Sequence, residues 1–347
     1  MIVALIPAHN EEAGIAQTVL SLQSQTVPPD HIIVIADNCT DNTAEIAESH
    51  GAMVFHTRDN VHKKAGGLNQ ALEFVMPHAE DTDFFLAVDA DGVLSETWIE
   101  KAIERLDETT GAISGACQIK EHPGILAMLQ RAEYAQGFRR VARKGGNVDV
   151  LSGAAALFSA RVLREVSEAR GDNLPGAKGT FYNEQSLTED FEITLSLQAL
   201  GYKPRCYKDL VVVTDVMDTV RDLYRQRLRW QRGTIDTLRE FGYNKTTRRM
   251  WALLAVCYIP LVVVTLTVFA WSVAFASDML TFQPMWLLLL PIFAVDQLVT
   301  SWRAGSKRSS MFVATLIPVW AYDVFKTYVY VRAAAGSIFS QKKIWIT

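Results

Sequence analysis

The chain has 347 residues, of which 49% are hydrophobic and 21% are charged, and its formal net charge is −4. This composition excludes a disordered chain, and a mean hydropathy of +0.10 is high for an enzyme that is soluble throughout. The charge is divided unevenly, because residues 251–347 hold 7 Lys or Arg against 3 Asp or Glu and the preceding residues are acidic. A basic, apolar end on an acidic body predicts a membrane anchor attached to a soluble domain.

The cysteine pattern and the distribution of basic residues exclude several classes of protein. The chain has 4 cysteines, which are scattered without a C-x-x-C pair. This spacing predicts neither a disulfide framework nor a zinc site, and it favours a reducing compartment for the body. The basic residues are confined to short segments of the chain, which does not indicate a nucleic-acid-binding surface. We therefore expect no nucleic-acid partner.

Short β-branched runs alternate with helical patterns along residues 1–216. The strand-like runs cover residues 2–6, 32–36, 53–56, 84–88 and 112–116, and the helical patterns cover residues 12–25, 42–50, 66–75, 98–106 and 191–200. This alternation predicts an α/β, Rossmann-like domain whose mixed, mainly parallel sheet is flanked by helices. In such sheets ligands bind at the carboxyl ends of the strands, so we look for a site in the residues after each run.

Charged residues follow the predicted strands in an order that suits a nucleotide sugar. Asp89 and Asp91 come directly after the fourth run, Lys64 lies upstream, and Glu189 and Asp190 open a later helix. An isolated D-x-D motif usually caps a turn, but the added lysine and carboxylates favour a site. Two such carboxylates can share Mg²⁺ or Mn²⁺, which would offset the charge that grows on a leaving diphosphate. Lys64 would add a positive charge to the same phosphates.

Sugar transfer with inversion requires one carboxylate that takes the proton of the acceptor hydroxyl. Asp190 is the candidate for this general base, and Glu189 is the adjacent alternative. A second interpretation is that one of them only favours the amino end of the helix over residues 191–200. Gly153 is a candidate for close approach of an acceptor sugar to the backbone, although tight strand packing also explains a glycine there.

Six motifs resemble, in order, those of family 2 inverting glycosyltransferases of the cellulose, chitin and hyaluronan synthase type. They cover residues 7–12, 37–41, 64–69, 89–91, 188–190 and 226–230. The resemblance extends over about residues 1–235 and implies a GT-A fold. Many such enzymes have two adjacent aspartates after the second strand, whereas here Ala36 precedes Asp37.

The resemblance also implies roles for individual residues. The implied nucleotide-sugar-binding residues are Pro7, Ala8, Asn10, Glu11, Asp37, Lys64, Asp89, Ala90 and Asp91. Within this set, Asp37 would contact the uracil, and Asp89 and Asp91 would approach the diphosphate and the metal. Asp190 would be the general base. Gln226, Arg229 and Trp230 would close over donor and acceptor.

Apolar stretches follow residue 250. Residues 252–276 contain no charge, residues 284–302 contain only Asp296, and residues 311–331 contain Asp323 and Lys326. The first two are predicted to span the membrane, and the third either spans it or lies as an interfacial or re-entrant segment. Arg248 and Arg249 precede the first span, so the positive-inside rule places residues 1–250 and 303–310 in the cytoplasm and 277–283 outside.

A basic segment connects the predicted catalytic domain, residues 1–216, to the predicted membrane region, residues 251–347. Between them, residues 217–250 alternate arginines with apolar residues at helical spacing, which is typical of a helix at the cytoplasmic membrane surface. Residues 125–144 suggest a second interfacial segment. For Gln226, Arg229 and Trp230 we favour a role in the site, because a tryptophan ring offers a face for a sugar.

These patterns together predict a multi-pass membrane hexosyltransferase that needs Mg²⁺ or Mn²⁺. Its donor would be a nucleotide sugar, most simply a UDP-sugar, and its acceptor a saccharide or lipid-linked molecule. Processive polysaccharide synthesis, single transfer to a polyprenyl phosphate and a catalytically silent scaffold that binds nucleotide sugars all stay open. A homo-oligomer also stays open.

Overall fold

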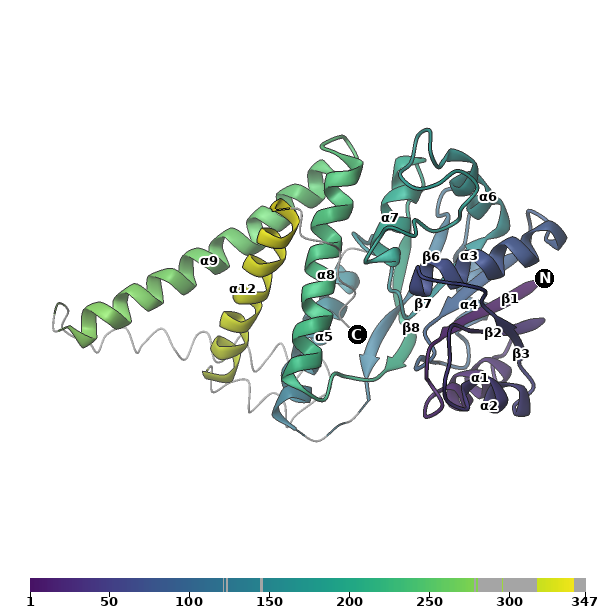
Figure 1. Cartoon of the computed structure of the whole chain (residues 1–347), viewed down its shortest axis with the longest axis horizontal. Coiled ribbons are helices and arrows are strands. Elements are labelled where there is room, and N and C mark those ends of the chain that lie inside the picture. The colour runs from purple at the N-terminus through teal and green to yellow at the C-terminus, as the bar shows by residue number, and fades with distance from the viewer. Residues whose placement is uncertain are drawn as a thin grey trace. The chain divides into compact units, whose positions relative to one another are not determined.

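The computed structural model describes residues 1–120, 122, 124–143, 146–277, 279, 295 and 317–339. The packing of the chain divides it into two compact units (Figure 1). The first contains residues 1–120 and 140–215, and the second contains residues 121–139 and the described residues from 216 onward. Apart from residue 295, the predicted span over residues 284–302 and the predicted loop over residues 303–310 lie outside the described residues.

One mixed sheet forms the centre of the first unit. Its strands are β1 (Ile2–Ala8), β2 (His31–Ala36), β3 (Met53–His56), β4 (Phe84–Val88), β5 (Val93–Leu94), β6 (Ala112–Ile119), β7 (Ala155–Ser159) and β8 (Arg205–Thr214). They lie in the order β3-β2-β1-β4-β7-β6-β8-β5. The predicted strands at residues 53–56 and 84–88 are confirmed at those bounds, and β5, β7 and β8 are additional.

The direction of the strands changes at β4, and this change positions the site. β1, β2, β3 and β4 are parallel, so their carboxyl ends meet at one edge. β7 is antiparallel to β4 and pairs Ala155 with Val88. The amide of Asp89 donates a hydrogen bond to the carbonyl of Ala154 at 3.0 Å. The segment that enters β7 therefore lies beside the segment that leaves β4.

Helices cover both faces of this sheet. They are α1 (Ile15–Gln23), α2 (Thr43–Ser49), α3 (Lys63–Val75), the short η1 (Met76–His78), α4 (Trp98–Arg105), α6 (Ala160–Ala169) and α7 (Glu189–Ala199). Buried residues of α1 and α4, such as Val19 and Trp98, join Ala4 and Ile6 of β1 in one core. The alternate side chains of β2 face the other way, where Ile35 approaches Gly67 of α3. This alternation across the strands gives a three-layer domain.

The second unit is helical. It contains most of α5 (Ile125–Arg143), together with α8 (Val220–Phe241), α9 (Arg248–Ala276) and α12 (Ile317–Ile338). α8 and α12 lie side by side in Figure 1 and pack together. The Glu133 carboxylate of α5 accepts hydrogen bonds from Arg227 of α8 at 2.7 Å and from Tyr322 of α12 at 2.8 Å.

α9 is the one helix in the described part of the chain whose length and apolar composition suit a membrane crossing. Its most apolar window has a mean hydropathy of 2.5, and only 6% of that window is buried. The predicted segment at residues 311–331 overlaps α12, where Lys326 and Asp323 form an ion pair at 2.7 Å.

Candidate active site

Asp37 follows β2 at the carboxyl edge of the parallel strands, and its side chain is held firmly. The residue is 5% exposed. Its Oδ1 atom accepts hydrogen bonds from Asn38 at 3.0 Å and from Thr57 and Asn60 at 2.8 Å each. Three donors on one oxygen leave the other carboxylate oxygen as the acceptor for a ligand.

Lys64 links three of the predicted site segments. It lies in the first turn of α3, and its Nζ atom is 2.6 Å from Asp89 and 2.9 Å from Glu189. It also donates a hydrogen bond to the carbonyl of Gly153 at 3.2 Å. Burial alone would lower the pKa of Lys64, but the charges of Asp89 and Glu189 outweigh it and raise that pKa. The ammonium therefore stays charged.

Acidic side chains gather around the D-x-D motif. Burial, followed by the charges of Asp91, Asp89 and Asp41, raises the pKa of Glu11 to about 7. Asp91 accepts a hydrogen bond from the Thr214 hydroxyl at 2.8 Å. The carboxylates in this corner repel one another, and Lys64 offsets part of their charge through its pair with Asp89.

This donor set fits a hard divalent cation. Carboxylate oxygens are the ligands that Mg²⁺ and Mn²⁺ prefer, and a cation would offset the carboxylate charges that, after burial, raise the pKa of Glu11. Asp91 and Asp89 are the residues that would hold it. Within the described residues no group of three or more His, Cys, Asp or Glu side chains has the geometry of a complete metal site. Water and phosphate oxygens would therefore supply the remaining ligands.

Glu189 and Asp190 open α7 and have different surroundings. Glu189 is 7% exposed and is paired with Lys64. Asp190 is partly exposed, and its Oδ1 atom accepts a hydrogen bond from the amide of Phe191 at 2.7 Å. Gly153 lies against Asp190, because a Cβ atom at Gly153 would be 3.0 Å from Asp190 Oδ2. A larger residue at this position would displace the candidate base.

These residues border one small cavity. It is lined by Lys64, Leu68, Ala87, Leu151, Ser152, Gly153, Ala156, Phe158, Tyr182, Glu189, Asp190 and Ile193. The structure thus brings Lys64, Glu189, Asp190 and Gly153 together at one cavity. The rest of the lining of this cavity is mostly apolar.

The remaining predicted donor-binding residues lie at the same edge of the sheet or in the adjoining turns. Pro7 and Ala8 end β1 and pair with the end of β2. Asn10 has a φ of 58°, and its side chain accepts a hydrogen bond from the amide of Thr40 at 2.8 Å. Ala90, between the two aspartates, is 5% exposed.

Gln226, Arg229 and Trp230 lie on α8 in the second unit. The neighbouring Arg227 stacks its guanidinium over the Trp230 ring at 4.3 Å and pairs with Glu133 at 2.7 Å. Trp230 is therefore supported by a buried cation within its own unit.

Several residues of the site carry no signal in the sequence. Thr57 and Asn60 reach Asp37 from the segment between β3 and α3, and Tyr182 enters the cavity from the segment between α6 and α7. They belong to none of the recognised motifs, so only the folded structure identifies them.

Comparison with known proteins agrees with these features. Residues 3–167 match the family profile described as glycosyl transferase family 2. A poly-β-1,6-N-acetyl-D-glucosamine synthase of Staphylococcus epidermidis is 24% identical over 285 residues, which cover 75% of this chain and 65% of that protein. The enzyme of the same name from Staphylococcus aureus strain COL is 26% identical over 255 residues, or 71% of this chain and 57% of that protein. The chain thus spans less than two thirds of the length of these relatives.

Among solved structures, the mannosyltransferase PcManGT from Pyrobaculum calidifontis, in complex with GDP-Man and Mn²⁺, has a TM-score of 0.65. It is 17% identical, and the match covers 98% of this chain and 88% of that one. At this identity the likeness concerns the fold, and it supports the GT-A-like arrangement. The family profile and the synthase relatives together lead to one conclusion: residues 3–167 of this chain are a domain of glycosyl transferase family 2.

Proposed function

We propose that this chain is a membrane-anchored, inverting glycosyltransferase that moves a sugar from a nucleotide sugar to a saccharide or lipid-linked acceptor. The observation that carries the proposal is the position of Lys64, 2.6 Å from Asp89 and 2.9 Å from Glu189, at the cavity that Asp190 also borders. A fixed ammonium among carboxylates suits a leaving diphosphate next to a base.

In the proposed reaction the acceptor hydroxyl oxygen attacks the anomeric carbon of the donor. The bond from that carbon to the phosphate oxygen breaks, and the electron pair leaves with the diphosphate. Asp190 takes the proton of the hydroxyl, so an α-linked donor gives a β-linked product. Glu189 serves a different purpose, because its pairing with Lys64 holds the ammonium in place.

Asp91 and Asp89 would hold the proposed Mg²⁺ or Mn²⁺. The ion, when bound, offsets the negative charge that gathers on the leaving diphosphate. The raised pKa of Glu11 supports this assignment, because the charges of Asp91 and Asp89 contribute to it after burial, and a cation would offset those charges. Lys64 adds its own fixed charge on the side of Asp89.

The surroundings of Asp37 support UDP as the nucleotide. One oxygen of this carboxylate is already occupied by Asn38, Thr57 and Asn60, so the carboxylate offers a single oxygen to a base. Uracil presents one N–H group between two carbonyls, whereas guanine presents two adjacent donors that would suit both oxygens. We therefore place uracil at Asp37.

The apolar helix α9 supports the membrane anchor. Most of its large side chains are exposed, among them Val256, Phe269 and Trp271, and such a surface is stable in lipid rather than in water. The basic helix α8 precedes it, which suits the cytoplasmic surface of a bilayer. The role of Gln226, Arg229 and Trp230 at the donor and acceptor rests on their motif.

The named synthase relatives favour polysaccharide synthesis as the outcome of repeated transfer. A single transfer to a polyprenyl phosphate is the alternative, because α9 is the one candidate span within the described residues. Incubating the purified protein in lipid with labelled nucleotide sugars and Mg²⁺ or Mn²⁺ tests the proposal. Long products indicate a polymerase, and one added sugar on lipid indicates single transfer. Failure to transfer any of the sugars, with nucleotide-sugar binding intact, would leave the scaffold hypothesis instead.

A further inference from the structure

One oxygen of the Asp91 carboxylate is already bound by the protein. Its Oδ2 atom accepts a hydrogen bond from the Thr214 hydroxyl at 2.8 Å and a second one from the amide of Asp215 at 3.3 Å. A carboxylate oxygen has two lone pairs, so these two donors fill Oδ2. Within the described residues no hydrogen bond reaches the other oxygen, Oδ1, and this oxygen is left for a ligand.

The pairing of β5 with β8 brings these donors to the D-x-D motif. β5 begins two residues after Asp91, and its Val93 pairs with Val213, the neighbour of Thr214. On its other side β8 is parallel to β6, where Thr214 pairs with Ile119. The backbone of Thr214 is therefore fixed by the sheet before an ion arrives, which lowers the entropy cost of binding the ion.

The first aspartate of the motif also has one oxygen engaged. Lys64 Nζ lies 2.6 Å from Asp89 Oδ1, and its positive charge repels a metal ion from that oxygen. Asp89 and Asp91 thus offer one oxygen each. Two carboxylates that bind in this way suit a small octahedral ion that takes its remaining ligands from water and phosphate, as Mg²⁺ does. Ca²⁺ is larger, takes more oxygen ligands and readily binds both oxygens of a carboxylate.

The hydrogen bond from Thr214 determines how the Asp91 carboxylate is turned. The last side-chain torsion of an aspartate has a broad, two-fold preference, so the side chain alone does not fix which oxygen faces an ion. Of the two bonds at Oδ2, the one from the Thr214 hydroxyl is the shorter. Mg²⁺ requires nearly ideal geometry, and it therefore depends strongly on a partner that orients its ligand.

We propose that Thr214 is a positioning and specificity-determining residue of the metal site: by occupying Oδ2 of Asp91 it leaves Oδ1 as the single ligand atom and favours Mg²⁺ or Mn²⁺ over Ca²⁺. The inference rests on the proposed binding of a divalent cation at Asp91 and Asp89, and it adds the residue that selects the cation. Thr214 acts through Asp91 and is not itself a ligand.

The test measures metal affinity rather than sugar transfer. Binding of Mn²⁺ to the full chain in detergent, with UDP present, is followed by the loss of the electron paramagnetic resonance signal of free Mn²⁺, and binding of Ca²⁺ by its competition with Mn²⁺. The wild-type protein should bind Mn²⁺ more tightly than Ca²⁺. In Thr214→Val, which keeps the shape of the side chain without its hydroxyl, the Mn²⁺ affinity should fall about 10- to 100-fold and the preference over Ca²⁺ should shrink.

Two further variants and one measurement separate this role from a general loss of structure. Thr214→Ser keeps the hydroxyl and should retain most of the Mn²⁺ affinity. Thr26→Val is the matched control, because the Thr26 hydroxyl donates at 2.7 Å to a carboxylate outside the site, that of Glu100, and its loss should leave the Mn²⁺ affinity unchanged. The affinity for UDP in EDTA should be the same in Thr214→Val as in the wild type.

The possible outcomes distinguish the inference from the proposed function. An unchanged Mn²⁺ affinity in Thr214→Val, or an equal fall in the affinities for Mn²⁺ and Ca²⁺, would overturn the inference and leave the proposed metal site intact. A wild-type protein that binds no Mn²⁺ with UDP would overturn the metal site and the inference with it. Binding as predicted without any sugar transfer would sustain the inference and refute the proposed catalysis.

Discussion

At the scale of single residues, the site separates positive and negative charge into defined positions. Lys64 forms ion pairs with two carboxylates from distant segments, while the charges of Asp91, Asp89 and Asp41 help to raise the pKa of Glu11. The first arrangement is complete in the protein itself, and the proposed metal ion would complete the second. Different substitutions should therefore affect catalysis, donor binding and stability separately.

The first prediction distinguishes the base from the binding residues. Asp190→Asn preserves shape and should keep donor affinity, but transfer should fall by roughly 10²–10⁴ because the general base is lost. Lys64→Ala should mainly weaken donor binding, since a phosphate contact exists in both the ground and transition states. Calorimetric donor affinity and single-turnover transfer measure the two effects. If Asp190→Asn lost donor binding but kept its rate at saturation, Glu189 would become the candidate base.

The second prediction concerns pH and stability. The pKa of Glu11 rises from an ordinary value of 4.5 to about 7 in the folded protein, so the folded state binds this proton more tightly than the unfolded state. The associated stabilisation is complete below pH 4.5 and is lost as pH rises through 7. Glu11→Gln should therefore gain Tm relative to the wild type between pH 5 and pH 8, measured by thermal denaturation in EDTA.

Asp107→Asn provides the control for this measurement. Hydrogen bonds from Thr110 and Thr109 lower the pKa of Asp107 to about 2, so its contribution changes well below pH 5. Its Tm difference from the wild type should be the same at pH 5 and pH 8. A constant difference for Glu11→Gln as well would show that Glu11 is ionised in the folded protein at both values.

At the scale of elements, the sequence predicts the parallel half of the sheet better than the rest. The runs that become β1, β2, β3 and β4 are rich in β-branched and aromatic residues between turn signals, so periodicity alone identifies them. Periodicity alone does not identify β7 and β8. β7 is a short Ala-Ala-Leu-Phe-Ser run, and β8 begins with Arg205 and includes Lys208 and Asp209. Their strand structure depends on pairing with β6 and β4.

The residues of the candidate site also differ in how far the sequence predicts them. Asp37, Asp89 and Asp190 could be predicted because each follows a strand or opens a helix with a recognisable pattern. Tyr182 could not, since its place depends on Asn69, more than a hundred residues away in the sequence. Nor does the sequence indicate that Glu189 pairs with Lys64. Contacts of this kind need the tertiary fold.

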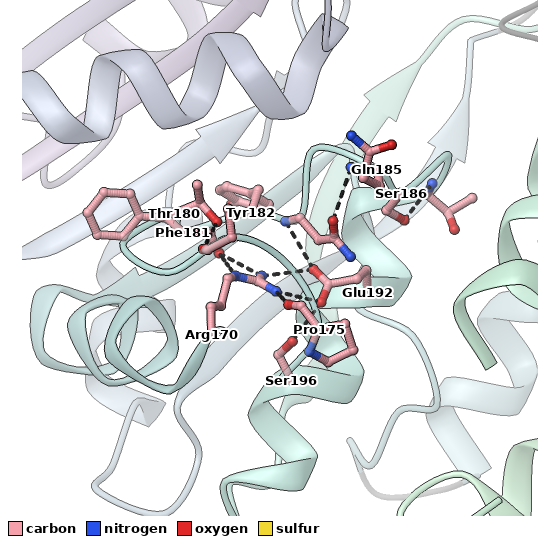
Figure 2. Close-up of polar contacts among 12 residues, drawn as sticks. Arg170, Pro175, Thr180, Phe181, Tyr182, Gln185, Ser186, Glu192 and Ser196 are labelled. Carbon is pink, nitrogen blue, oxygen red and sulfur yellow. Dashed lines mark hydrogen bonds and ion pairs between the residues drawn. The ribbon is translucent and has the colours of Figure 1, made fainter. Parts of the chain in front are cut away.

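The third prediction concerns the buried ion pair between Arg170 and Glu192, the second of which lies in α7 (Figure 2). Arg170→Met leaves Glu192 charged and unpaired in a site with no solvent contact, and it should cost about 3–5 kcal/mol of unfolding free energy. The double substitution Arg170→Met with Glu192→Leu removes both charges and should cost much less. Urea denaturation of both variants measures the difference. A loss in the double variant as large as the loss in Arg170→Met would show that the pair does not act as a unit.

The exposed pair Arg105–Asp209 serves as the comparison. Its two side chains are 31% and 41% exposed, so Arg105→Met should cost no more than about 1 kcal/mol. A loss at Arg105 equal to the loss at Arg170 would contradict an explanation based on burial.

At the scale of the whole molecule, membrane topology gives the fourth prediction. Arg248 and Arg249 are the first two residues of α9, and the seven residues 277–283 contain no Lys or Arg, so residues 277–283 should face outward. In a background without native cysteines, Ser277→Cys should react with an impermeant thiol reagent applied to intact cells. Ser306→Cys, in the predicted cytoplasmic loop, should react only after the membrane is opened. The reverse labelling pattern would invert the proposed orientation.

The antiparallel pairing of β4 with β7 also determines the order in which the site can be assembled during synthesis. Asp37, Lys64 and Asp89 accompany the parallel strands, which leave the ribosome first and pair among themselves. Gly153 reaches them only when Ala155 pairs with Val88, and Asp190 follows later still. A nascent chain can thus form the proposed nucleotide-binding end of the site well before it contains the proposed base, Asp190. The proposed sugar transfer therefore has to wait until β7 pairs with β4 across the long segment between them and Asp190 has been synthesised.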